Sequence, residues 1–201
     1  KITALLGPNG AGKSSLVLAL AGILPIERGE VQIGGQPMAG QAPEAIRSAG
    51  LAAVPEGHRV LSGMTVHDNL LAAGFGHKAR ADRLLAQVGL AKFAGHLANN
   101  MSGGQQQMLA LGQALVARPK FILADEMSLG LSPLIVKRLM GVVVKLAEQG
   151  TGILLIEQFT HIALKIAHHA NVMSRGRLTF SGDPQRLVDE PEILHRAYLA
   201  Q

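Results

Sequence analysis

The chain has 201 residues, 48% of them hydrophobic but only 3% aromatic, and it contains no cysteine. This composition indicates one compact α/β domain with an aliphatic core, excludes a disulfide-stabilised fold, and offers no apolar run of the roughly 18 residues that a membrane-spanning helix needs. The net charge of +5 comes from scattered lysines and arginines. Without a basic block or interleaved aromatic side chains, this charge indicates a solvated surface, and we expect no nucleic-acid partner.

Hydrophobic periodicity and turn residues predict strands and helices in alternation. The expected strands lie at 2–6, 29–35, 51–56, 121–125 and 152–157, and a terminal hairpin joins 170–174 to 177–181. The expected helices lie at 14–21, 42–50, 66–73, 79–88, 102–117, 133–149, 160–168 and from 191 onward. Apolar strands that alternate with helices indicate a mainly parallel sheet with helices on both faces.

The middle of the chain differs from this alternation. The segment from about 58 to 118 has helices but no clear strand, so we expect a helical subdomain inserted into an α/β core of about 1–57 and 119–201. Together these parts form a single domain, 1–201. The chain enters an apolar strand directly after Lys1. Because a domain rarely begins inside its core, we expect an N-terminal strand segment to be missing.

A glycine-rich loop follows the first expected strand and precedes the first expected helix. It matches the phosphate-binding pattern G-x-x-x-x-G-K-[ST] in the context that this pattern requires, and its residues are Gly7, Pro8, Asn9, Gly10, Ala11, Gly12, Lys13, Ser14 and Ser15. Backbone N–H groups and the helix N-terminus would hold the phosphates of ATP, Lys13 would reach the β- and γ-phosphates, and the Ser14 hydroxyl would ligate Mg²⁺. The alternative is an ordinary strand–turn–helix connection.

An acidic pair ends the expected strand at 121–125. Asp125 and Glu126 emerge at its carboxyl end, the edge at which open α/β sheets bind ligands. Asp125 can hold Mg²⁺, and Glu126 can align and deprotonate an attacking water. Taken alone, such an ending is often only a capped loop, but the phosphate-binding loop favours the functional interpretation.

A second helix start suited to an anion lies in "MSGGQ". Ser102 is a candidate N-cap, and Gly103 and Gly104 would let a ligand approach the backbone ahead of Gln105. A plain capped helix would explain this stretch if it stood alone.

Together these motifs resemble the ATP-binding-cassette (ABC) ATPase family. The phosphate loop, "MSGGQ", "FILADE", "SLGLSP" and "LLIEQ" occur in the family's order, and "MSGGQ" resembles its signature motif, with Met101 in the usual leucine position. The resemblance implies a P-loop NTPase core with an inserted helical subdomain. It also implies that two ATPase domains meet head to tail, each ATP lying between one chain's phosphate loop and the other chain's signature.

The sequence departs from the family pattern at four further positions. Glu56 replaces a usual glutamine, Gln158 a usual histidine, Ser132 a usual aspartate and Met127 a usual proline. By resemblance, Glu56 belongs to the nucleotide site and Gln158 is a catalytic contact to the γ-phosphate beside Lys13 and Glu126. A surface acid and a strand-end amide are the plain alternatives.

As they stand in this chain, the motifs resemble those of the shorter ATPase of the branched-chain amino acid importer. This resemblance implies a peripheral protein on the cytoplasmic face of the cell membrane. Its implied partners are a second ABC ATPase in a homo- or heterodimer, permease subunits and, indirectly, a solute-binding protein. The alternatives are transport of another solute such as urea, an amide or a lipid, a non-transport ABC protein, and a nucleotide-binding scaffold without turnover.

Overall fold

A computed structural model of the protein describes residues 1–57, 60–74 and 78–199. Its centre is a six-stranded sheet with the strand order β4-β5-β6-β1-β7-β8. Five strands are parallel and β8 pairs antiparallel with β7, which confirms the mainly parallel sheet and the terminal hairpin. The strands are β1 (Ile2–Leu6), β4 (Leu51–Val54), β5 (Phe121–Asp125), β6 (Gly152–Ile156), β7 (His169–Ser174) and β8 (Arg177–Gly182).

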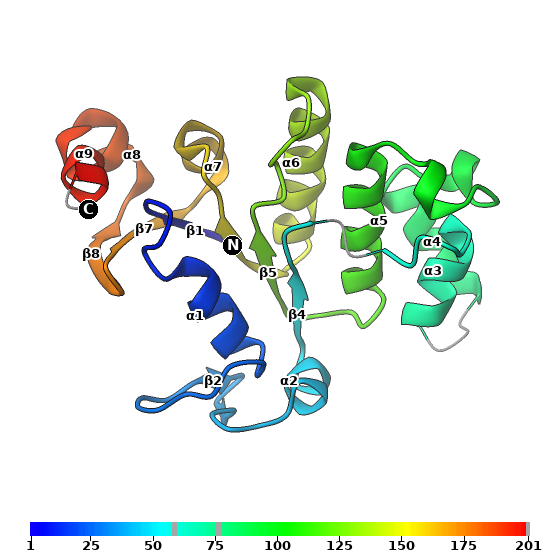
Figure 1. Ribbon diagram of the computed structural model, residues 1–201, viewed down its shortest axis with the longest axis horizontal. Helices are drawn as coiled ribbons and strands as arrows, with labels where there is room; N and C mark the ends of the chain where they lie inside the picture. Colours follow the sequence, from blue (N-terminus) through cyan, green and yellow to red (C-terminus); the bar gives the residue numbers. More distant parts are fainter. Residues whose placement is uncertain (58–59, 75–77, 200–201) are drawn as a thin grey trace.

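Helices cover both faces of this sheet (Figure 1). They are α1 (Lys13–Leu20), α2 (Pro43–Ala49), α3 (Val66–Ala73), α4 (Lys78–Gln87), α5 (Gly103–Leu115), α6 (Pro133–Glu148), α7 (Thr160–Ile166), α8 (Pro184–Asp189) and α9 (Glu192–Leu199). Two short 3₁₀-helices lie at Ala91–Phe93 and Ala98–Asn100. Among the described residues, no helix is long and apolar enough to cross a membrane.

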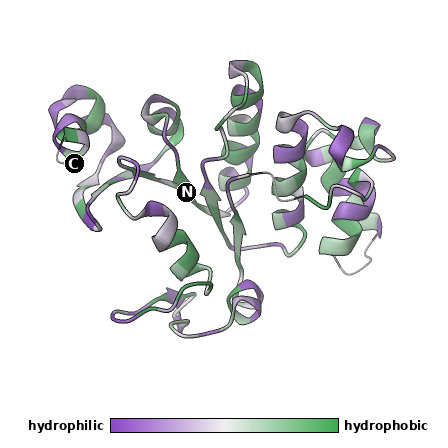
Figure 2. Cartoon of the chain, in the orientation of Figure 1, coloured by the Kyte–Doolittle hydropathy of each residue, from purple (hydrophilic) through white to green (hydrophobic). Residues whose placement is uncertain are grey.

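Alternation along the strands divides the core into two layers. In β1, Ile2, Ala4 and Leu6 join a large cluster with α6, α7 and the helices α3 to α5, whereas Leu5 joins a smaller cluster with α1 and α2. This division follows from the period of two in a strand, which points successive side chains to opposite faces. Figure 2 shows mainly hydrophobic central strands, whereas the surrounding helices carry both hydrophobic and hydrophilic residues.

Helices α3, α4 and α5 pack against one another beside the sheet, and α5 also contacts β4 and α6. Thr65 caps α3 as predicted, because its side chain accepts a hydrogen bond from the Asp68 N–H. The fully buried Asn69 joins this helix to its surroundings: its amide donates to the Leu61 carbonyl at 3.0 Å and accepts from Gln113 at 3.1 Å. The predicted boundary at residue 58 lies outside the described residues.

The structure differs from the local predictions in two places. The segment 29–35 is not one strand but the start of a small hairpin of β2 (Gln32–Ile33) and β3 (Gln36–Pro37), because Gly34 and Gly35 adopt positive φ angles of 59° and 81° and reverse the chain. Helix α8 was not predicted at all. Asp183 caps it by accepting from the Gln185 N–H at 2.8 Å, and Pro184 occupies its first turn.

Candidate functional site

The phosphate-binding loop connects β1 to α1 at the carboxyl end of the sheet. A Cβ at Gly7 would lie 2.1 Å from the Met173 carbonyl oxygen, so only glycine lets the loop approach β7 this closely. Gly10 and Gly12 have φ angles of 79° and 100°. No side chain caps α1 at Gly12, so the backbone N–H groups of its first turn stay available to an anion.

Lys13 lies folded across this loop. Its side chain is 5% exposed, and its Nζ donates hydrogen bonds to the carbonyls of Gly7 at 2.8 Å and Pro8 at 3.0 Å. Neither partner is charged, so these two bonds do not neutralise the ammonium. Its positive charge is suited to phosphate oxygens. Asn9, Ser14 and Ser15 are exposed around it.

Asp125 shows where the acidic groups of the site converge. The pKa of its carboxyl is raised to about 6: burial is the largest cause, the charges of Glu126 and Glu56 add to the rise, and the charge of Lys13 opposes it. These effects on Asp125 show that Lys13, Glu56 and Glu126 lie near enough for their charges to act on it. The Asp125 Oδ1 atom is buried and has no hydrogen-bond partner. A divalent cation such as Mg²⁺ fits this arrangement, because it would occupy an orphaned carboxylate oxygen among acidic neighbours.

Glu126 and Gln158 are placed by the ends of two adjacent strands. The Glu126 backbone N–H donates to the Ile156 carbonyl at 2.9 Å, and Glu126 itself adopts a φ of 44°, unusual for a residue other than glycine. Gln158 lies two residues beyond Ile156 and is exposed at the same edge of the sheet. The half-buried Glu126 carboxylate and the Gln158 amide therefore emerge from neighbouring strands.

Glu157 is a residue of this edge whose importance the sequence analysis missed. It is 1% exposed, and burial raises its pKa to about 7. Its carboxylate accepts from the Ser128 N–H at 3.2 Å and from the Ser128 hydroxyl. An acid that directly follows four apolar residues, as in "ILLIE", is the sequence signal that could have identified it.

The signature motif lies elsewhere in the chain. Ser102 caps α5 in a capping box with Gln105: the Gln105 N–H donates to Ser102 Oγ at 3.4 Å and the Ser102 N–H to Gln105 Oε1 at 2.9 Å. A Cβ at Gly104 would lie 2.5 Å from a methyl group of Ile135, so this glycine is required for packing against α6. In Figure 1, α5 is separated from α1 by β4, β5 and α6. One chain therefore does not bring the signature to its own phosphate loop.

The comparison with known families agrees with this geometry: the family model described as "ABC transporter" matches residues 1–128. This chain belongs to the ABC transporter family. Members of its ATPase class hydrolyse ATP to drive transport, so the chain is an ATPase subunit of a transporter. The fold prediction and the family resemblance are confirmed.

The similarity to curated relatives extends over nearly the whole chain. It is 37% identical over 205 residues to the high-affinity branched-chain amino acid transport ATP-binding protein BraG of Pseudomonas aeruginosa, covering 99% of this chain and 88% of that protein. It is 25% identical to the lipopolysaccharide export system ATP-binding protein LptB of Haemophilus influenzae, covering 100% of this chain and 86% of that one.

Solved structures share the fold. The ADP conformation of an ATP-binding cassette of an ABC transporter matches with a TM-score of 0.89 at 24% identity, over 100% of this chain and 88% of that chain. A dimeric post-hydrolysis cassette bound to ADP and phosphate matches with a TM-score of 0.81 at 23% identity, over 92% of this chain and 85% of that chain. At these identities, the likeness supports the fold alone.

Proposed function

We propose that this chain is the ATP-hydrolysing subunit of an importer for branched-chain amino acids. The observation that carries this proposal is the identity of 37% to BraG over 99% of the chain. The similarity spans the α/β core and the helices α3 to α5, so it covers the nucleotide site and the part of the chain beside it.

The nucleotide would bind at the carboxyl end of the sheet. The loop from Gly7 to Ser15 would hold its phosphates, and Lys13 would exchange its two carbonyl partners for phosphate oxygens. Ser14 and Asp125 would hold Mg²⁺, which when bound neutralises developing negative charge on the phosphates. Because Asp125 Oδ1 has no protein partner, the metal would satisfy an atom that is otherwise orphaned.

Hydrolysis would depend on Glu126 and Gln158. The Glu126 carboxylate would orient the attacking water and accept its proton. Gln158 would donate an amide hydrogen bond to the γ-phosphate, where a histidine is usual in the family. Glu56, whose charge acts on Asp125, would contact the same site from the end of β4.

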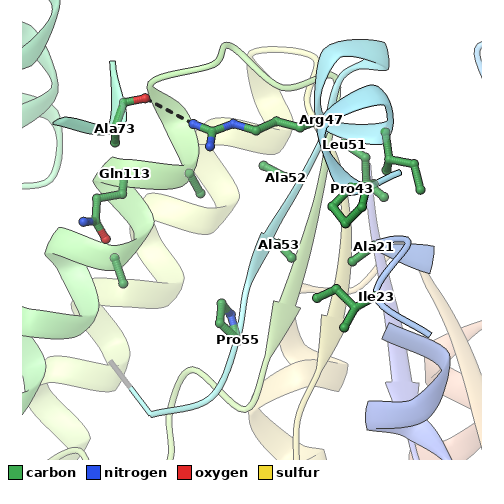
Figure 3. Close-up of a pocket in the computed structure, with 13 residues that line it drawn as sticks. Ala21, Ile23, Pro43, Arg47, Leu51, Ala52, Ala53, Pro55, Ala73 and Gln113 are labelled. Carbon is green, nitrogen blue, oxygen red and sulfur yellow. Dashed lines mark hydrogen bonds between the residues drawn. The ribbon is translucent and has the colours of Figure 1, made fainter. Parts of the chain in front are cut away.

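A cavity of about 440 Å³ between the α/β core and α5 offers a surface for a permease subunit. Figure 3 shows Ile23 and Pro43 on one side, Gln113 on the other and Pro55 near the Glu56 loop. Arg47 closes one end, because its guanidinium donates to the Ala73 carbonyl at 3.2 Å. A partner segment in this cavity would touch the core and the helical part together, and so would sense their relative movement when ATP binds.

The proposed assembly follows from the nucleotide site and from the cavity for a permease subunit. Residues 1–201 would form one cassette, with the core at about 1–57 and 119–201 and the helical subdomain at about 58–118. Two ATPase subunits would associate beneath the permease, on the cytoplasmic face of the membrane. A solute-binding protein would reach them only through the permease.

Uptake of radiolabelled leucine tests the solute. Cells that lack the gene would be complemented with the wild-type chain or with Glu126→Gln, and only the wild type should restore uptake. The similarity to LptB favours lipid export as the second candidate. Normal leucine uptake in the deletion strain, with lipid retained in the inner membrane, would establish the second candidate and reject the first.

A further inference from the structure

The Glu157–Ser128 contact joins two segments that are far apart in sequence. Both side chains are 1% exposed. Both Glu157 oxygens are used: Oε1 accepts from the Ser128 backbone N–H at 3.2 Å, and Oε2 accepts from its hydroxyl. A single buried carboxylate therefore fixes both the backbone and the side chain of a residue in the loop between β5 and α6.

This arrangement is electrostatically unfavourable. Burial is the largest cause of the raised pKa of Glu157; the two hydrogen bonds from Ser128 lower that pKa in part, and the nearby charges of Glu126 and Asp125 raise it. No cation offsets these effects, since the ion pairs of the described residues do not include Glu157. A glutamine would avoid burying a charge at this position while keeping one acceptor oxygen for Ser128. Such a local conflict is expected where a residue serves function rather than stability.

The contact joins the two segments that carry the groups proposed to act on the γ-phosphate. Ser128 follows Glu126 by two residues, and Gln158 directly follows Glu157. One residue before Glu157 and two before Ser128, the Glu126 N–H donates to the Ile156 carbonyl at 2.9 Å. The two contacts form consecutive cross-links between the ends of β5 and β6. Together they constrain the backbone segments from which the Glu126 and Gln158 side chains extend.

We propose that Glu157 is a positioning residue that, through Ser128, holds the loop after β5 so that Glu126 and Gln158 converge on one nucleotide. The inference rests on the proposed roles of those two residues. Glu157 is not itself expected to touch ATP, because its carboxylate is buried and both of its oxygens are engaged by Ser128. Glu157 affects the relative position of Glu126 and Gln158 during ATP hydrolysis, not the affinity for ATP.

A double-mutant cycle in the assembled transporter tests this proposal. Glu157→Ala removes both hydrogen bonds, and Ser128→Ala removes only the hydroxyl one. A catalytic group misplaced by about 1 Å can lower turnover by about 100-fold, so we expect kcat to fall by about 10- to 100-fold in Glu157→Ala and by less in Ser128→Ala. Adding Ser128→Ala to Glu157→Ala should cause no further loss, because the contact is already gone.

Two further readouts separate positioning from a purely structural role. The Kd for ATP, measured by calorimetry on each single variant, should stay within about threefold of the wild-type value, a change of less than about 0.7 kcal/mol. Glu157→Gln retains one acceptor oxygen and should recover part of the kcat lost in Glu157→Ala. The matched control is Glu190→Gln, which removes the same charge from an exposed pair with Arg186 and should leave kcat unchanged.

The outcomes distinguish this inference from the proposed site. If Glu126→Gln is inactive while Glu157→Ala and Ser128→Ala retain wild-type kcat, the site stands and the positioning role is wrong. The role is also wrong if the two losses of kcat are additive, or if ATP affinity falls as much as kcat. If Glu126→Gln hydrolyses ATP normally, the proposed site itself is wrong. Should Glu157→Ala fail to fold, Ser128→Ala and Glu157→Gln still carry the test.

Discussion

The Lys13 ammonium lies 2.8 Å from the carbonyl oxygen of Gly7, at the start of its own loop. Together with a second bond to the Pro8 carbonyl at 3.0 Å, this contact holds a cation in the position that phosphate oxygens would approach. The Lys13 ammonium is thus already positioned in the loop. On nucleotide binding it would exchange its two neutral carbonyl acceptors for charged phosphate oxygens.

Replacing this cation should remove both binding and turnover. We expect Lys13→Ala to weaken the affinity for ATP by about 10- to 100-fold, the value of one hydrogen bond to a charged group, and to abolish hydrolysis. Calorimetry and a phosphate-release assay measure the two effects. Lys137→Ala, on the exposed face of α6, is the matched control and should change neither. Hydrolysis at the wild-type rate by Lys13→Ala in the assembled complex would contradict the assignment.

Glu126→Gln should separate binding from chemistry. The amide keeps the shape of the side chain, and the backbone bond to the Ile156 carbonyl is unaffected. The amide cannot accept the proton of the attacking water, so we expect kcat to fall by at least about 100-fold while ATP stays bound. Size-exclusion chromatography should then show an ATP-dependent dimer that persists. If the variant turns over normally, another group activates the water.

The sequence predicted the parts of this site that are local. The phosphate loop, the ends of β5 and β6 and the Ser102 cap each depend on residues within a few positions of one another. The Glu157–Ser128 contact could not be predicted in this way, because its partners are 29 residues apart and meet only when β5 pairs with β6. Its raised pKa likewise results from burial by the whole fold.

The helix missed at α8 is a different case. Asp183 and Pro184 repeat the pattern of a polar residue followed by proline that correctly placed the start of α6 at Ser132 and Pro133. Six helical residues give too little periodicity to be detected. The Asp183 cap could therefore be predicted from the sequence, whereas the short helix that follows it depends on burying Leu187 against the core.

Glu157 should make the stability of the protein depend on pH. Its pKa rises from 4.5 to about 7 on folding. Between these values the folded state binds more protons than the unfolded state, so the free energy of unfolding falls as pH increases. The loss is on the order of 3 kcal/mol from this group and is complete above about pH 7.

Urea denaturation of the wild type and of Glu157→Gln at pH 5 and pH 8 measures this dependence. The neutral amide cannot titrate, so relative to the wild type the variant should be more stable at pH 8 than at pH 5. Groups far from Glu157 titrate alike in both proteins and cancel in the comparison, whereas Asp125 and Glu126, whose charges act on Glu157, belong to the measured difference. Glu190→Gln should follow the wild type. Parallel pH profiles for wild type and Glu157→Gln would mean that Glu157 does not hold a proton in the folded protein.

The signature should act on the nucleotide of a partner subunit. In one chain, α5 and the phosphate loop are separated by β4, β5 and α6 (Figure 1). The phosphate loop covers one side of the triphosphate, and the transferring phosphoryl group spreads negative charge over several oxygens. The α5 N-terminus of a second subunit would cover the other side, so that ATP itself would hold the dimer together.

Gly103→Asp tests this arrangement. A carboxylate in the first turn of α5 is compatible with the helix dipole, so the isolated chain should fold and bind ATP normally. In the dimer the same carboxylate would face the partner's γ-phosphate, and repulsion should prevent closure and hydrolysis at that site. Gly95→Asp adds the same charge in open space and should leave both properties unchanged.

Site-resolved photolabelling with an ATP analogue in a heterodimer distinguishes the two subunits. With Gly103→Asp in one subunit, nucleotide trapping should be lost at the phosphate loop of the other subunit, whereas Lys13→Ala should abolish trapping at its own. Made separately in the same subunit, Gly103→Asp should therefore affect the partner's nucleotide site and Lys13→Ala the subunit's own site. If Gly103→Asp instead prevents the isolated chain from binding ATP, the signature serves its own chain and the head-to-tail arrangement is wrong.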